Sequence, residues 1–128
     1  MEIPSCSCGS DKKINLIYAC SGAANTGLLA DQAARRLSLE GVGNMSCLSG
    51  IGANLSNFVE NAKTAKNILI DGCPVACGKK MFDNLELPYQ HLIITNFGVE
   101  KGKTVITEDV IEQVKGSLKE AILNETQN

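Results

Sequence analysis

The chain has 128 residues, of which 44% are hydrophobic, and this is enough to build the core of one domain. Acidic and basic residues are interspersed and the formal net charge is −2, so no basic patch indicates a nucleic acid partner. No apolar run approaches the ~20 residues that are needed to span a bilayer, which argues against a membrane partner.

Residues 1–13 are polar and are expected to form a flexible arm that carries Cys6 and Cys8. They contain no basic region followed by an apolar run, so no signal peptide is predicted and a cytoplasmic location is favoured. In a reducing compartment, six cysteines are more typical of metal ligands or redox groups than of disulfides. The pair in the arm could fold over and add ligands to a metal site, or it could be two exposed thiols without a shared role.

Four short apolar runs predict β-strands, and each is followed by a stretch that favours a helix. The strands are expected at residues 14–19, 44–48, 68–70 and 92–95, and the helices at 28–40, 54–65, 74–84 and 108–123. Thr107 is expected to cap the last helix, and residues 124–128 are expected to form a disordered tail. The folded domain is therefore predicted to span residues 14–123.

Strands that alternate with helices in this way form a parallel sheet with helices on both faces. The predicted fold is a single-domain α/β sandwich of three layers, Rossmann- or flavodoxin-like, with four parallel strands in the order 2-1-3-4. Ligands of such sheets bind beyond the carboxyl ends of the strands, where the strand order reverses. That point is expected between the first and the third strand.

Cysteines occur on the carboxyl side of three predicted strands. Cys20 follows the first strand, Cys47 lies near the end of the second, and Cys73 follows the third, with Cys77 one helical turn later. The four sulfurs are therefore expected to converge at one edge of the sheet. Tetrahedral thiolate coordination suits Zn²⁺ or an iron–sulfur centre, and the spacing does not separate the two. Any one of these cysteines could instead be a small buried hydrophobic side chain.

The local sequence around these cysteines indicates two special turns. Pro74 suits the first position of a helix because its missing N–H costs nothing there, which places Cys73 at or beside the N-cap. The positive end of the helix dipole would then favour thiolates, the form that binds metal. Residues 21–27 are mostly small, so they are expected to form a tight turn, and replacing Gly22 by Val is expected to disturb the site.

Three motifs resemble those of the DGC-domain family, which is named after an Asp-Gly-Cys sequence. They are residues 18–27 (Tyr-Ala-Cys-Ser-Gly-Ala-Ala-Asn-Thr-Gly), 45–52 (Met-Ser-Cys-Leu-Ser-Gly-Ile-Gly) and 71–80 (Asp-Gly-Cys-Pro-Val-Ala-Cys-Gly-Lys-Lys). The resemblance extends over about residues 14–115. It implies a zinc-binding protein whose four motif cysteines correspond to Cys20, Cys47, Cys73 and Cys77.

Several polar residues near the motifs have two interpretations each. Asp71 could orient a metal ligand from the second coordination shell, or it could cap its own turn. Lys79 and Lys80 could hold an anion or balance the negative charge of thiolates, or they could belong to a solvated helix face.

Two other positions are interpreted more simply. Asn25 and Thr26 could bind an anion at a helix start, although such residues are more often N-caps. His91 is expected to precede the fourth strand, at the end of the sheet opposite the cysteines, and is excluded as a ligand.

The sequence therefore predicts a metal-binding protein, with zinc as the first metal, in metal storage, sensing or homeostasis. Four thiolates on one Zn²⁺ leave no open position for catalysis, whereas three would leave room for a water. The alternative is a thiol redox or iron–sulfur protein that uses Cys73 with Cys77 or Cys20. A regulatory role is a further option, but the sequence indicates no protein partner.

A cysteine phosphatase or arsenate reductase would have a similar arrangement of strand, cysteine loop and helix. Such an enzyme needs an arginine six residues after its nucleophile. That position is Thr26 here, and the nearest arginine is Arg35, well inside the predicted helix. This class is therefore disfavoured.

Overall fold

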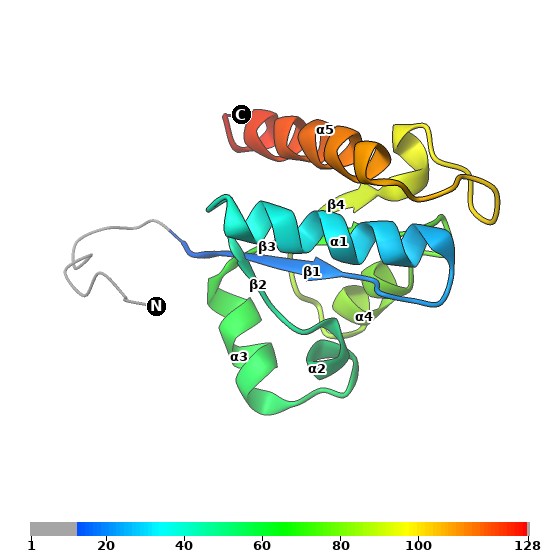
Figure 1. The fold of residues 1–128 in the computed structure, drawn as a ribbon. Coiled ribbons are helices and arrows are strands. Elements are labelled where there is room, and N and C mark those ends of the chain that lie inside the picture. The colour runs from blue at the N-terminus through cyan, green and yellow to red at the C-terminus, as the bar shows by residue number, and fades with distance from the viewer. Residues whose placement is uncertain (1–12, 128) are drawn as a thin grey trace.

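One parallel sheet organises the computed structural model, which describes residues 13–127 (Figure 1). Its strands are β1 (Asn15–Ala19), β2 (Asn44–Met45), β3 (Lys66–Asp71) and β4 (Gln90–Ile93), and their order is β2-β1-β3-β4. This order and the parallel direction confirm the predicted α/β fold. Cys6 and Cys8 lie outside the described residues.

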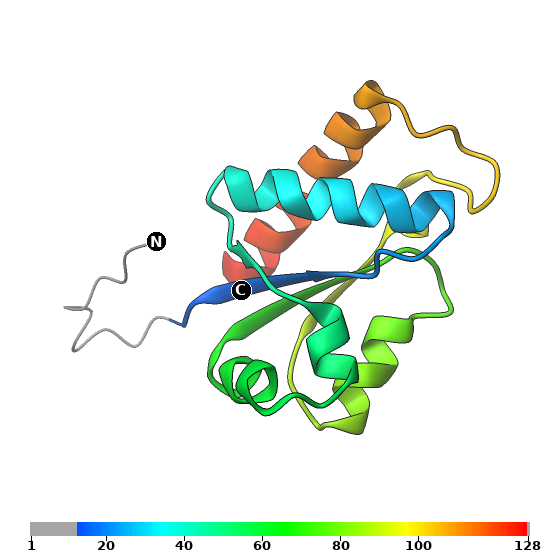
Figure 2. The same ribbon diagram turned by 60° about the horizontal axis from the view of Figure 1, so that its bottom comes forward.

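Helices cover both faces of this sheet (Figures 1 and 2). On one face lie α1 (Asn25–Leu39) and α5 (Glu108–Gln127), together with the short 3-10 helix η2 (Ile94–Phe97). On the other face lie α2 (Leu48–Gly52), α3 (Ser56–Thr64) and α4 (Cys77–Asn84). The connection after β1 therefore turns to one face and the connection after β3 to the other.

The alternation of side chains along β1 and β3 explains the two layers. Ile17 and Ile70 are fully buried against the layer of α1 and α5, whereas Tyr18 and Leu69 are buried against the layer of α2 and α4. Because successive side chains of a strand point to opposite faces, a continuous apolar run is required when both faces are covered.

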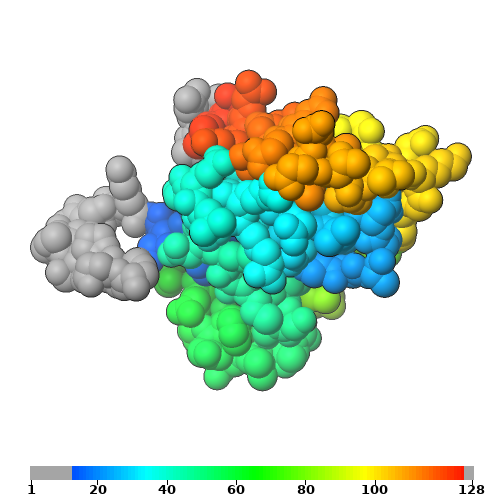
Figure 3. Space-filling model, viewed as in Figure 1, coloured from blue at the N-terminus to red at the C-terminus, as the bar shows by residue number. Residues whose placement is uncertain are grey.

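The helix α5 packs beside α1, and the two lie side by side on the surface shown in Figure 3. Its buried face is the one that its periodicity predicted, with Ile111, Val114, Leu118 and Ile122. The hydroxyl of Thr107 accepts a hydrogen bond from the Val110 N–H, 3.2 Å away, which confirms the predicted cap.

Three boundaries of helices differ from the prediction by more than two residues. The helix α1 begins at Asn25 rather than at residue 28. The helix α5 continues to Gln127 rather than ending at residue 123, because residues 124–127 contain no glycine or proline that would stop it. The helix α4 begins at Cys77 rather than at Pro74. Proline also fits the second position of a β-turn, and here the Ala76 N–H bonds to the Cys73 carbonyl and closes such a turn.

The chain between β1 and β4 also departs from the prediction. The strand β2 is short, and the helix α2, which contains two glycines, follows it where no helix was predicted. The glycines there serve close packing, because a Cβ at Gly50 would lie 2.5 Å from Phe58 and one at Gly52 would lie 2.9 Å from Met81. The strand β4 begins at Gln90, so His91 lies inside it. Among residues 13–127, no helix has the length and apolar character needed to cross a membrane.

The packing of α5 gives a prediction. Leu118 is fully buried, whereas Leu123 on the same helix is 45% exposed. Replacing Leu118 by Ala should lower the free energy of unfolding by about 2–5 kcal/mol, because it leaves a cavity under the helix. The matched change Leu123→Ala should cost no more than about 1 kcal/mol. Urea unfolding followed by circular dichroism measures both, and equal losses would show that α5 is not docked by this face.

Candidate metal centre

Three cysteines line one small cavity at the carboxyl edge of the sheet. The cavity has a volume of about 310 Å³, and Cys20, Cys73 and Cys77 contribute to its wall. It lies between the loop after β1 and the loop after β3, which is the predicted point where the strand order reverses. All four described cysteines are free thiols.

Cys20 is held at the end of β1 by its backbone. Its N–H donates to the carbonyl of Ile70 over 2.9 Å, which extends the pairing of β1 with β3 by one residue. Burial raises the pKa of the Cys20 thiol, and negative charge on Asp71 and Cys77 raises it further, while the backbone of Gly22 and Gly72 acts in the opposite direction. A cation bound in the cavity would reverse the main effect, because a coordinating thiol loses its proton.

Cys73 and Cys77 lie on either side of a tight turn. The residue before Cys77 is Ala76, which has a left-handed backbone with a φ of 54° and is buried. L-residues other than asparagine and aspartate rarely adopt this conformation, so the turn holds local strain. The helix therefore begins at Cys77 with Ala76 as its N-cap, so the predicted position of Cys73 at or beside the N-cap is wrong.

Asp71 holds the start of α4 from the end of β3. Its carboxylate is 1% exposed and accepts hydrogen bonds from the N–H groups of Gly78, at 2.9 Å, and Lys79, at 3.1 Å. These are free donors of the first helical turn, so Asp71 caps α4 across the turn and not its own turn as the sequence suggested. The predicted role of Asp71 in orienting a metal ligand stays a prediction.

His91 lies close to the cysteine cavity, not at the opposite end of the sheet. Its Nε2 is 2.7 Å from the second carboxylate oxygen of Asp71. The predicted position was wrong because β4 begins earlier than expected, so His91 lies inside the strand and pairs with Leu69, two residues before Asp71 on β3. The imidazole also contacts Tyr89 edge-on, with 5.8 Å between ring centroids.

A lysine from a distant loop contacts Cys73. The Lys101 Nζ lies 3.4 Å from the Cys73 sulfur, although 28 positions separate the two residues. The sequence pointed instead to Lys79 and Lys80, but the Lys79 ammonium pairs with Asp83 at 2.8 Å. No short-range motif links Lys101 to Cys73, so the sequence alone could not identify it.

Asn25 is not the N-cap of α1, whereas anion binding at this helix start stays a prediction. The N-cap of α1 is Ala24, without a side-chain cap, and the Asn25 amide instead bonds to the backbone of residues 100–104. Thr26 beside it is buried, with 1% exposed.

Cys47 lies in a separate hollow. This hollow has a volume of about 600 Å³ and is lined by Cys20, Cys47, Arg35 and Asp31, among others. Cys47 is exposed and precedes α2, and Cys20 forms part of the wall of both hollows. Arg35 does reach this hollow, but its Nε is bound to Asp31 at 2.8 Å, so it is not a free clamp for an oxyanion.

The chemistry of these side chains fits a metal that binds thiolates, but the described side chains do not lie close enough together to bind one. Thiols are the ligands that Zn²⁺ and iron–sulfur clusters take, and three of them border one cavity. Within residues 13–127, however, no three histidine, cysteine, aspartate or glutamate side chains lie close enough together to hold a metal ion. The sulfurs would therefore have to move closer when a metal binds.

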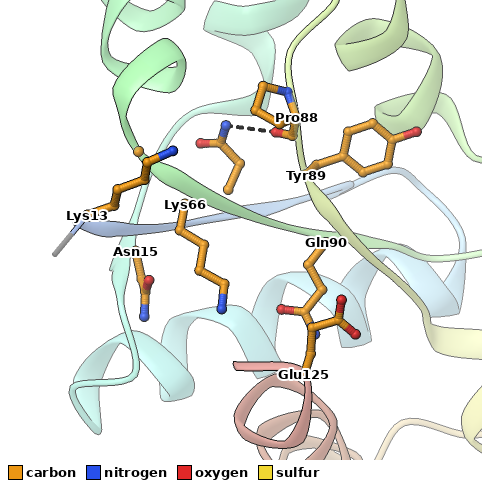
Figure 4. Close-up of a pocket in the computed structure, with 9 residues that line it drawn as sticks. Lys13, Asn15, Lys66, Pro88, Tyr89, Gln90 and Glu125 are labelled. Atoms are coloured by element: carbon orange, nitrogen blue, oxygen red, sulfur yellow. Dashed lines mark hydrogen bonds between the residues drawn. The ribbon is translucent and has the colours of Figure 1, made fainter. Parts of the chain in front are cut away.

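A larger hollow at the opposite edge of the sheet has different chemistry. It has a volume of about 700 Å³, and its wall comes from the starts of β1 and β3, from β4 and from the end of α5 (Figure 4). Lysine, amide and carboxylate side chains line it, including Lys13, Asn15, Lys66, Gln90 and Glu125. None of the described residues that line it is a sulfur ligand, so it is not proposed as the predicted metal site.

The loop after β1 gives a second prediction. A Cβ at Gly27 would lie 2.4 Å from the Gly22 carbonyl oxygen, whereas a Cβ at Gly22 would meet nothing within 4 Å. The expectation that Gly22 must be small is therefore wrong, and the requirement falls on Gly27. Gly27→Ala should cost about 1–3 kcal/mol net, because a clash with backbone outweighs the better helix propensity of alanine. Gly22→Ala should be close to neutral. Thermal unfolding compares them, and equal melting temperatures would contradict this account.

The cap on α4 gives a third prediction. Asp71→Asn places an amide NH₂ against backbone N–H donors, so at least one buried hydrogen bond is lost, and stability should fall by about 2 kcal/mol. Asp83→Asn on the same helix serves as the control, because this exposed carboxylate contacts only Lys79 and Tyr89 among the described side chains, and it should have a smaller effect. Hydrogen exchange should show faster opening at residues 77–80 in Asp71→Asn alone.

Comparisons with known proteins agree with the motifs. The sequence pattern of the DGC domain matches residues 16–118. A relative from Pseudomonas aeruginosa, the anaerobic and virulence modulator AnvM, is 37% identical over 93 residues, which cover 71% of this chain and 71% of the relative. No solved structure gives a significant match. The matched range includes the four cysteines of the described structure, and the chain belongs to the DGC domain family.

Proposed function

We propose that this protein binds a metal ion, with zinc as the first choice, through the cysteines of the candidate metal centre. The observation that supports this is the convergence of Cys20, Cys73 and Cys77 on one cavity. Loops from two neighbouring strands supply these thiols, so the fold gathers a donor set that is scattered along the chain. An iron–sulfur centre is the second choice, because it uses the same ligands.

The proposed ligands differ in how the structure holds them. Cys20, Cys73 and Cys77 form the core of the site, and Cys47 is the fourth proposed ligand, which would approach through the hollow that it shares with Cys20. Cys6 and Cys8 are further candidate ligands. Zinc with four thiolates would be a closed site for storage or sensing, while three thiolates and a water would permit hydrolytic chemistry.

The family supports a regulatory use of the site. AnvM is named as an anaerobic and virulence modulator, and we infer that this protein likewise modulates another process according to its metal state. We also propose, as the sequence predicts, that the protein is cytoplasmic and has no nucleic acid or membrane partner.

A thiol redox function is the second candidate. The observation that favours it is the Lys101 ammonium beside the Cys73 sulfur, with Cys77 across the same turn. A positively charged side chain beside a cysteine is typical of redox-active cysteines, and a second thiol in the same cavity could resolve an oxidised one.

The first test is elemental analysis with an absorption spectrum, on protein purified anaerobically without added metal. About one equivalent of zinc without visible absorption supports the proposal, and iron with a brown colour supports the iron–sulfur alternative. Protein without metal but with titratable thiols would overturn both and favour the redox function.

The contribution of each cysteine gives a fourth prediction. Single Cys→Ser variants at positions 20, 73 and 77 should lower zinc affinity by at least about tenfold, because each removes a thiolate from the core of the site. Cys47→Ser should have a smaller effect, and Cys6→Ser the smallest. Competition with a chromophoric chelator measures the affinities. Equal losses for Cys73→Ser and Cys6→Ser, or no loss for either, would contradict the proposed ligands.

A further inference from the structure

We propose that the loop of residues 100–104 contributes to the function of the cysteine site. In this proposal Lys101 supplies the positive charge that the sulfurs need, and Asn25 is the positioning residue that holds the loop in place. The positive charge of Lys101 beside Cys73 follows from the geometry alone. The use of that charge in metal binding rests on the proposed function.

The Asn25 side chain clamps the loop with both ends of its amide. The Nδ2 donates to the Glu100 carbonyl, at 3.0 Å, and to the Thr104 carbonyl, at 2.8 Å. The Oδ1 accepts from the Gly102 N–H at 2.7 Å. Each end of the loop and its middle are thus tied to the first residue of α1, which itself follows the Cys20 loop.

The loop is also closed by its own bonds. The Glu100 N–H donates to the Thr104 hydroxyl at 2.8 Å, and the Thr104 N–H donates to the Glu100 carbonyl at 3.1 Å. Gly102 has a φ of 82°, which a residue with a side chain rarely adopts. The backbone next to Lys101 is therefore fixed, and its exposed side chain reaches Cys73 from a defined base.

The charge of the cavity explains why a cation is needed. Its wall contains three thiols and the buried carboxylate of Asp71, and among the described lining residues Lys101 is the one that carries a positive charge. Three thiolates around one Zn²⁺ leave a net charge of −1, and four leave −2. An ammonium in contact with a sulfur lowers the energy of such a centre, because charges that are partly shielded from water interact strongly.

The charge at Cys73 can be measured without any metal. Iodoacetate and iodoacetamide alkylate the same thiolate, so the ratio of their rates does not depend on the fraction of thiol that is deprotonated. That ratio depends on the local charge, because only iodoacetate is an anion. Mass spectrometry of the peptide that contains Cys73 gives both rates in the apo protein.

Lys101→Met should lower the ratio of iodoacetate to iodoacetamide rates at Cys73 by about two- to fivefold at low ionic strength. The difference should shrink in high salt, which a purely structural effect would not do. Lys101→Arg should restore most of the ratio. Lys103→Met removes the same charge from the same loop and should change the ratio less. Equal changes for Lys101→Met and Lys103→Met would overturn the proposal.

Asn25→Ala tests the positioning role. It should lower the ratio at Cys73 towards the value of Lys101→Met and speed hydrogen exchange at residues 100–104. A melting curve identifies a variant that fails to fold, and in that case Gly102→Val, which strains the same loop, takes its place. A wild-type ratio in a folded variant with a loosened loop would overturn the role of Asn25.

Zinc affinity separates this inference from the proposed function. Lys101→Met should weaken zinc binding by about two- to tenfold, and Lys103→Met should leave it nearly unchanged. The wild-type protein could bind no metal while Lys101→Met still lowers the alkylation ratio at Cys73. In that case the proposed function fails, and the role of Lys101 as the positive charge beside Cys73 is supported. If zinc binds equally to all variants, the loop has no part in the metal site and this inference fails.

Discussion

The buried carboxylate of Asp71 is the interaction on which the cysteine edge of the molecule depends. A buried charge is costly unless it is fully hydrogen-bonded, and here two backbone N–H groups and His91 satisfy it. These bonds fix where α4 begins, and Cys77 is its first residue. Gly78 must lack a side chain, because a Cβ there would lie 2.9 Å from the same carboxylate. The Asp-Gly-Cys motif therefore supplies the carboxylate that caps α4 as well as one thiol of the cavity.

The features that sequence could predict are those set by local pattern. Short apolar runs identified the strands β1 and β3, and their alternation with helices predicted the parallel sheet and its order. Because parallel strands end at a common edge, the convergence of Cys20, Cys73 and Cys77 on that edge followed from topology. Their role as metal ligands is still a prediction.

The features that sequence missed depend on contacts between distant segments or on residues with two uses. Nothing near Asn25 in the sequence indicates that it holds the loop that carries Lys101, since its bond to Glu100 spans 75 positions. Pro74 fits both a helix start and a β-turn, and the cap from Asp71 decides in favour of the turn. His91 was misplaced because a strand boundary moved by two residues.

The separation of Cys47 from the other three thiols constrains how a metal could be held. Close packing of Gly50 on Phe58 and of Gly52 on Met81 holds α2 against its neighbours, so the helix cannot shift freely towards the cavity. The fourth donor must then come from rotation of the exposed Cys47 side chain, from another thiol or from water. A site with three core donors and one interchangeable donor suits sensing better than storage, because its last ligand can respond to metal, oxidant or partner while the three core thiolates remain bound.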